Sequence, residues 1–225
     1  MLNFNNMLTV SEAAEKIINR SRYLSEAISK GIINISSLSR YIKPELEEML
    51  SKKVSNAAIF MALNRLSSQI KPKYVFKNIF KTPPDMIVRS NLVEITVTHS
   101  ETLVEKYPEL LKMSGPKDKY FFTITEGVFE TTIIASLDLK SSIKNALKNE
   151  AIAAEFSNLS SITIRLPKEA ISTPGIFYFF LKSLAWEGVN IIEIVSAYLE
   201  FTLILPEKET NRAFSILQSL FVKTV

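Results

Sequence analysis

The chain has few side chains with the chemistry of a catalytic site. It has 225 residues, no cysteine and a single histidine, His99. Because no second histidine or cysteine can complete a triad or a metal cluster, we interpret His99 as a structural or surface residue rather than as a ligand or an acid–base group. The paired carboxylates Glu47–Glu48 and Glu207/Glu209 fall on helix positions that we expect to face solvent. The five glycines are not clustered, which excludes a glycine-rich phosphate loop.

One loop has residues suited to holding a small anion. The turn residues Ser172–Gly175 precede an apolar segment, residues 176–186, that has helical periodicity. Gly175 would let backbone N–H groups approach a carboxylate closely, and the N-terminus of the helix adds a favourable dipole. The alternative is that Gly175 serves only as the turn that starts the helix.

Residues 161–225 predict the elements that would position this loop. Ile162, Ile164 and Leu166 alternate with polar residues, as in a half-buried strand. The helix should end at Gly188, followed by strands at 189–199 and 200–206, an amphipathic helix at 209–220 and a short last strand at 221–225. The order strand, helix, strand, strand, helix, strand is typical of ferredoxin-like folds.

This region resembles an ACT domain, and most closely the regulatory half of aspartokinases. The resemblance rests on residues 173–177 before the first helix, on Gly188-Val189-Asn190-Ile191 at the start of the second strand, and on residues 201–217. In that family the Pro-Gly loop lies beside the Asn-bearing strand start, at an interface between two modules, and binds a small effector that is usually an amino acid. The resemblance thus implies an effector site formed by Thr173, Pro174, Gly175, Ile176, Asn190 and Ile191. The alternative for Asn190 is that it only caps the turn into the strand.

An internal repeat extends the resemblance to the preceding residues. Residues 90–97, SNLVEITV, align with residues 157–164, SNLSSITI, at an offset of 67. The same offset pairs Ile124 with Ile191, Glu126 with Glu193 and Ala146 with Ala213. Such self-similarity indicates a repeated unit. The first copy is predicted to contain strands at 90–98, 119–128, 130–137 and 152–156 and helices at 101–113 and 141–149. We therefore predict two tandem ACT-like modules, residues 86–157 and 158–225, as in aspartokinase regulatory halves.

The two copies differ in the loop that the resemblance assigns to the effector. The first copy has Ser100-Glu101-Thr102 there, with no glycine, and Pro108 within its helix. A carboxylate side chain in this loop would repel the carboxylate of an amino acid. We therefore expect the pocket of the second copy to be the competent one, and the first copy to pair with it.

The N-terminal residues predict short helices. Thr9 and Glu12 have the spacing of a capping box, and the helix that follows should end at Gly31. A second helix should start near Ser36, with a break or kink at Lys43 and Pro44 opening a new segment. A third should follow Ser55, over residues 56–69. We predict a three-helix domain of helix-turn-helix or winged-helix type at residues 1–70 and a linker at 71–85, although any packing of three helices would give the same pattern.

Charge is distributed unevenly along the chain. Residues 1–81 carry a net charge of +7 and residues 82–225 a net charge of −3. This asymmetry suggests that the N-terminal part meets a polyanion. The candidate phosphate contacts are Arg40, Lys43, Lys52, Lys53, Asn64 and Arg65. The alternative is an ordinary solvated surface, because DNA-binding proteins usually show a denser basic stripe.

Taken together, these patterns predict an α+β protein with regulatory function. No segment is apolar enough to span a membrane and no signal peptide is evident, so we expect a cytoplasmic protein. The Lys-Phe-Gly-Gly-type motif that opens the aspartokinase catalytic half has no match, and the resemblance implies regulation without kinase activity. We predict an effector sensor, dimeric through its ACT modules, whose N-terminal helices bind DNA as a transcription regulator. The alternative is a regulatory subunit that docks on a separate aspartokinase-like enzyme, with Phe60 and Met61 as anchors.

Overall fold

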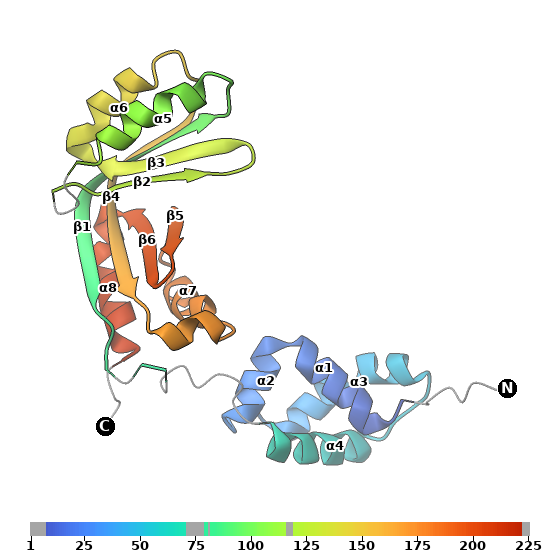
Figure 1. Ribbon diagram of the computed structural model, residues 1–225. Coiled ribbons are helices and arrows are strands. Elements are labelled where there is room, and N and C mark those ends of the chain that lie inside the picture. The colour runs from blue at the N-terminus through green and yellow to red at the C-terminus, as the bar shows by residue number, and fades with distance from the viewer. Residues whose placement is uncertain (1–7, 71–78, 81, 116–118, 222–225) are drawn as a thin grey trace. The chain divides into compact units, whose positions relative to one another are not determined.

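The computed structural model describes residues 8–70, 79–80, 82–115 and 119–221. The chain divides into two compact units, residues 1–75 and 76–225 (Figure 1). Most of the predicted linker and residues 222–225 of the predicted last strand lie outside the described residues. No helix in the described ranges is long and apolar enough to cross a membrane.

The first unit is built from helices around one apolar core. Its described helices are α1 (Val10–Arg20), α2 (Arg22–Ser29), α3 (Ile35–Leu50) and α4 (Asn56–Gln69). The capping box is confirmed, since the Thr9 side chain accepts from the Glu12 N–H and the Glu12 carboxylate accepts from the Thr9 N–H. The side chains that fill the core include Ile18, Ile42, Leu46, Ile59 and Leu63.

Two helix boundaries in this unit differ from prediction. The first predicted helix is divided at Ser21, whose hydroxyl caps α2 by accepting from the Leu24 N–H. Of the break or kink predicted at Lys43, the break is wrong, because α3 continues through Pro44. A proline inside a helix costs about 3 kcal/mol. Ile42 and Leu46, on either side of Pro44, are both fully buried, and their burial keeps the helix continuous.

The second unit combines one antiparallel sheet with helices. The strands are β1 (Met86–Thr98), β2 (Phe122–Glu126), β3 (Glu130–Ser136), β4 (Ile152–Arg165), β5 (Glu193–Ala197) and β6 (Glu200–Pro206), in the spatial order β2-β3-β1-β4-β6-β5. The helices are α5 (Leu103–Lys112), α6 (Lys140–Ala146), α7 (Ile176–Trp186) and α8 (Thr210–Ser219). The prediction of a mixed helix and antiparallel-sheet protein is confirmed.

The two central strands, β1 and β4, each run through both halves of the sheet. Residues 92–98 of β1 pair with β3, whereas residues 86–89 pair with residues 161–164 of β4. Residues 152–165, which were predicted as two separate strands, form the single strand β4. The segment beside the second half of β4 therefore comes from residues 86–89.

The repeated Ser-Asn-Leu motif marks the middle of both long strands. Asn91 and Asn158 have φ angles of 58° and 57°, in the left-handed region that asparagine tolerates better than most residues. The register of β1 and β4 shifts at this point, and Leu92 then pairs with Leu159. The repeat thus places a matching irregularity in each strand where it passes from one half to the other.

Cross-strand pairs show that the residue offset between the two copies is different in the later strands. A hydroxyl pair recurs in both halves, with Thr96 and Thr132 at 3.0 Å and Thr163 and Thr202 at 2.8 Å. Ile124 lies opposite Ile133, and Ile194 lies opposite Leu203 at the corresponding place. The predicted match of Ile124 with Ile191 is therefore wrong, and so is that of Glu126 with Glu193, because the second half has three more residues before β5.

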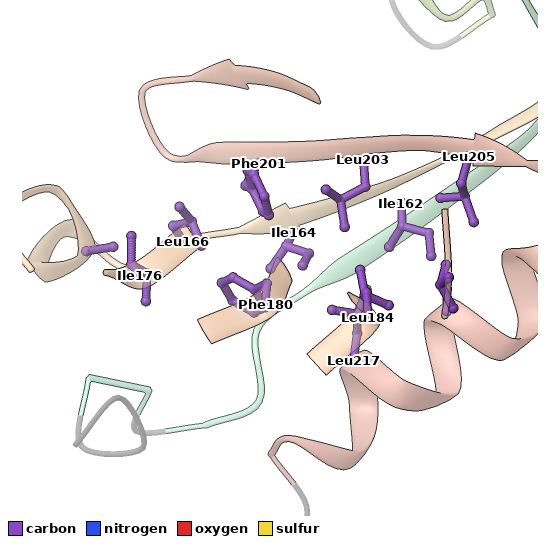
Figure 2. Packing of buried hydrophobic residues seen from close by; sticks show 13 residues of the cluster. Ile162, Ile164, Leu166, Ile176, Phe180, Leu184, Phe201, Leu203, Leu205 and Leu217 are labelled. Carbon is purple, nitrogen blue, oxygen red and sulfur yellow. The ribbon is translucent and has the colours of Figure 1, made fainter. Parts of the chain in front are cut away.

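Helices cover one face of each half of the sheet. In the second half, the covered core includes Ile162, Ile164, Phe180, Leu203 and Leu217 (Figure 2). In the first half, Val93, Ile95 and Val97 of β1 pack with α5 and α6 residues such as Leu110 and Ile143. Since strand side chains alternate, Leu92, Glu94 and Thr96 point to the opposite face. That face is also buried, by a separate cluster of Leu92, Ile134, Leu159 and Ile204, which we call the seam cluster.

Candidate functional site

The loop before α7 has the open helix start that the sequence predicts. Gly175 is the N-cap residue of α7, with a φ angle of 84°, and no side chain caps the helix. The Thr173 hydroxyl donates to the Glu169 carbonyl at 2.7 Å and so points back into the preceding 3-10 helix (Lys168–Ser172). Pro174 and Gly175 are exposed. A side chain other than glycine, asparagine or aspartate would be strained at this φ angle.

The second predicted segment follows the end of α7. Gly188, with a φ angle of 70°, ends the helix, and the Val189 N–H donates to the Leu184 carbonyl at 3.0 Å. This is the hydrogen-bond pattern of a glycine-terminated helix. Asn190 follows as an exposed residue, and Ile191 is half-buried. The backbone turn thus presents Asn190 to solvent between two anchored apolar residues.

One apolar core holds both predicted segments. Ile176 is 4% exposed within the core cluster of the second half (Figure 2). Ile191 packs against the same cluster. The exposed members of the set, Pro174, Gly175 and Asn190, adjoin these anchors in sequence. Their role in binding remains a prediction.

An open depression of about 360 Å³ lies near the beginning of this loop. Leu166, Pro167 and Glu169 line one side of it, and residues between Ile79 and Asp85 line the other. None of the six predicted effector residues lines this depression.

The corresponding loop of the first half is already filled by a carboxylate. Glu150 accepts hydrogen bonds from the hydroxyls of Ser100, at 2.5 Å, and Thr102, at 2.8 Å. These bonds, that of Ser100 first, hold the pKa of Glu150 below its ordinary value. The sequence pattern had pointed to Glu101 as the carboxylate of this loop. Glu150 was missed because it is distant in sequence, and only the fold brings it to Ser100.

His99 lies in a hydroxyl network beside this loop. Its Nε2 is 3.1 Å from the hydroxyl of Thr131, and the Tyr107 hydroxyl is 3.2 Å from the same oxygen. Thr131 is fully buried. No group of three or more potential metal-ligating side chains occurs in the described ranges. This arrangement fits the interpretation of His99 as a structural residue.

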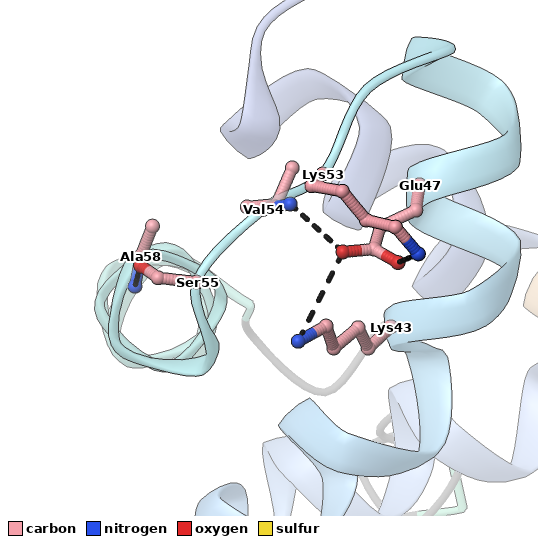
Figure 3. A network of polar contacts seen from close by, with 6 residues as sticks. All are labelled: Lys43, Glu47, Lys53, Val54, Ser55 and Ala58. Atoms are coloured by element: carbon pink, nitrogen blue, oxygen red, sulfur yellow. Dashed lines mark hydrogen bonds and ion pairs between the residues drawn. The ribbon is translucent and has the colours of Figure 1, made fainter.

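In the first unit, Glu47 offsets the charge of two candidate phosphate contacts. Its carboxylate lies 3.9 Å from Lys43 Nζ and 3.4 Å from Lys53 Nζ, and it accepts from the Val54 N–H at 2.8 Å (Figure 3). The Val54 bond is the main cause of the lowered pKa of Glu47. The expectation that Glu47 faces solvent is wrong, because its side chain is only 15% exposed and fastens the turn between α3 and α4.

The other candidate phosphate contacts lie on the surface. Arg40 donates to the hydroxyls of Ser36 and Ser37 one turn earlier on α3. Arg65 on α4 donates to the Ser11 hydroxyl at 3.5 Å. Lys52 and Asn64 are exposed. The set therefore spans α3, the following turn and α4, and its role in phosphate binding is untested.

Comparison with solved structures shows the fold. The Clostridium acetobutylicum aspartate kinase, described as an allosteric enzyme, superposes with a TM-score of 0.52 at 16% identity over 63% of this chain. The ligand-free regulatory subunit of aspartate kinase from Thermus thermophilus also gives 0.52, at 15% identity over 63% of this chain. The match covers 35% of the kinase but 100% of the regulatory subunit. A scan against protein-family models finds no match, and neither does a search of curated proteins. At these identities the likeness is one of fold, to the regulatory domains of aspartokinases.

Proposed function

We propose that this chain is a non-catalytic regulatory protein that senses an amino acid or a related small metabolite. Residues 86–157 and 158–225 would form two ferredoxin-like ACT modules, with residues 86–89 lying beside the first strand of the second module. The recurring threonine pairs and the left-handed backbone conformation of Asn91 and Asn158 support a repeated structural unit. The fold of aspartokinase regulatory domains supports the sensing role.

The proposal rests on a difference between the loop before α7 and the loop before α5. Before α7, Gly175 leaves the helix start without a capping side chain, and Pro174 beside it is exposed; Asn190, which follows the other end of α7, is also exposed. Before α5, the Glu150 carboxylate occupies the hydroxyls of Ser100 and Thr102. A free amino acid carboxylate would thus meet a helix start without a capping side chain in one loop and a resident negative charge in the other.

A matched pair of variants tests this site. Asparagine and aspartate have nearly the same shape and both tolerate a positive φ angle, so Gly175→Asn and Gly175→Asp differ chiefly in charge. We would measure thermal shifts of both variants and the wild type against the twenty amino acids. A ligand at 100 times its Kd stabilises the folded state by about 2.7 kcal/mol. We expect the shift to persist in Gly175→Asn and vanish in Gly175→Asp.

Two results would contradict the site. Equal shifts in both variants would place the ligand elsewhere, and a flat panel for the wild type at millimolar ligand would remove the sensing role for amino acids.

For the first unit we propose DNA binding as the main function. Helix α4 contains no acidic residue and exposes Asn64 and Arg65, and Lys52 lies on the turn before it. Lys43 and Lys53 are weaker candidates because they share Glu47. Mobility-shift titrations at 50 and 200 mM salt would test this, because phosphate contacts make affinity fall steeply with salt. We expect Arg65→Ala to weaken binding and Lys53→Ala to change it less; no binding at low salt would exclude the function.

The second candidate is docking on a separate amino-acid biosynthetic enzyme. Met61 on α4 is 56% exposed, which favours an apolar contact, and Phe60 beside it is half-buried. A pull-down with wild type and Met61→Asp would distinguish the candidates. Loss of a captured biosynthetic enzyme in the variant, with DNA binding absent, would favour docking.

We also propose that the chain dimerises through the ACT-like modules. β2 and β5 are the edge strands of the sheet and would offer unpaired backbone groups to a second copy. Sedimentation equilibrium would check this, with a dimer mass expected at micromolar concentration and a monomer mass contradicting it.

A further inference from the structure

Glu94 is a buried carboxylate that the proposed sensing site does not use. It lies on β1, is 5% exposed, and its Oε2 has no hydrogen-bond partner among the residues the structure describes. Its cross-strand neighbours are Ile134 on β3 and Phe156 on β4, and neither carries a charge. A buried carboxylate without full hydrogen bonding is costly when ionised, so a native protein that keeps one calls for a physical explanation.

Both halves of the sheet contribute residues to the apolar cluster on the face that carries Glu94. The seam cluster takes Leu92 and Ile134 from the first half and Leu159 and Ile204 from the second, each at most 3% exposed. Phe121, just before β2, and Ile192 and Val195 at the other edge pack against this cluster. Residues next to both edge strands of the sheet therefore pack against one apolar cluster.

The charge of an acid from the second half also affects the pKa of Glu94. Glu193 begins β5 and pairs with Ile204, a member of the seam cluster. Burial first, and the charge of Glu193 second, raise the pKa of Glu94 to about 7. Glu94 would therefore exchange its proton near neutral pH, whereas an ordinary glutamate does so near pH 4.5.

We propose that Glu94 and Glu193 make the seam a proton-dependent latch between the two halves of the sheet. With Glu94 neutral, β5 packs against the seam cluster. With Glu94 ionised, repulsion from Glu193 and the need of the buried charge for water loosen β5 and Ile192. The latch does not require an effector, but Asn190 and Ile191 directly precede Ile192, so its opening would also disturb the proposed sensing site.

Amide hydrogen exchange tests the latch in the full chain without ligand. We would compare exchange of residues 192–197 between pH 6 and pH 8 after correction for intrinsic rates. Ionisation of a group with a pKa near 7 rises from about 9% to about 91% over this range, so exchange in the wild type should accelerate roughly tenfold. Glu94→Gln, which keeps the shape and removes the charge, should abolish the acceleration.

Two further variants serve as controls for this test. Glu193→Gln removes the repelling charge and should move the midpoint of the change to lower pH. Glu130→Gln, at an exposed position on β3, should behave like the wild type. An unchanged pH response in Glu94→Gln, or no response in the wild type, would overturn the proposal. Loss of the latch with amino acid binding intact would leave the sensing proposal standing.

Discussion

The buried Glu94 carboxyl should make the stability of the second unit depend on pH. Its pKa is about 7 when folded and 4.5 when exposed, so the folded state binds the proton more tightly. Its stabilising contribution is fully present below about pH 4.5 and is lost as the pH rises through 7. One pKa unit corresponds to 1.36 kcal/mol, so the loss is about 3 kcal/mol.

We therefore expect Glu94→Gln to be more stable than the wild type at pH 8 and about equal to it at pH 5. Urea unfolding at several pH values would measure the difference. A difference that stays constant with pH would contradict the assignment of the shift to Glu94.

Asn91 and Asn158 should tolerate glycine and reject β-branched residues. Both have positive φ angles, which cost a β-branched residue far more than glycine. We expect Asn158→Val to destabilise the second unit by about 1–3 kcal/mol and Asn158→Gly to be close to neutral. Thermal unfolding of the two variants would measure this, and equal melting temperatures would show that the left-handed turn is not needed.

For single residues, the sequence pattern predicted the features that depend only on neighbouring residues in the chain. The alternation of Ile162 and Ile164 correctly marked the face that packs on helices. It could not indicate that the opposite face, with Glu94 and Leu159, is also buried, because the packing residues Phe121, Ile192 and Val195 come from distant parts of the chain. Glu150 was hidden for the same reason, since Ser100 and Glu150 are far apart in sequence.

Among the elements, α4 depends on its N-cap. The Ser55 hydroxyl accepts from the Ala58 N–H at 3.2 Å and satisfies a donor that has no partner within the helix. We expect Ser55→Ala to destabilise the first unit by about 1 kcal/mol, and Ser55→Asp to be tolerated. Circular dichroism of thermal unfolding would detect this, and unchanged melting in Ser55→Ala would refute the importance of the cap.

The elements also show where local signals mislead. Pro44 is a strong local reason to end a helix, yet α3 continues because Ile42 and Leu46 are buried on the same side. No feature of residues 86–89 in the sequence indicates their partner. They pair with β4 because β1 is long enough to extend beside its second half. By contrast, Gly175 and Gly188 were correctly placed at the ends of α7, because left-handed backbone at a helix end is a local requirement.

At the scale of the whole second unit, the shared strands should make the two halves unfold together. β1 and β4 each contribute residues to both halves, and the seam cluster joins them. Phe180 is fully buried in the second half, and its replacement by alanine should cost about 3–5 kcal/mol. We expect Phe180→Ala to lower the exchange protection of residues 93–97 in the first half as much as that of residues 201–205. Protection that persists in the first half would mean that the halves are independent.

Such coupling would suit a sensor. A ligand that orders the loop before α7 would also stabilise the strands that both halves share, so its effect would extend beyond the site.

Amide chemical-shift mapping during titration with the amino acid that stabilises the chain most is the most direct test of the sensing proposal. We predict that the largest changes fall on residues 173–177 and 189–191, with little change at residues 99–103, where Glu150 already occupies the loop. Changes confined to other residues, or no saturable change with any amino acid at millimolar concentration, would contradict it.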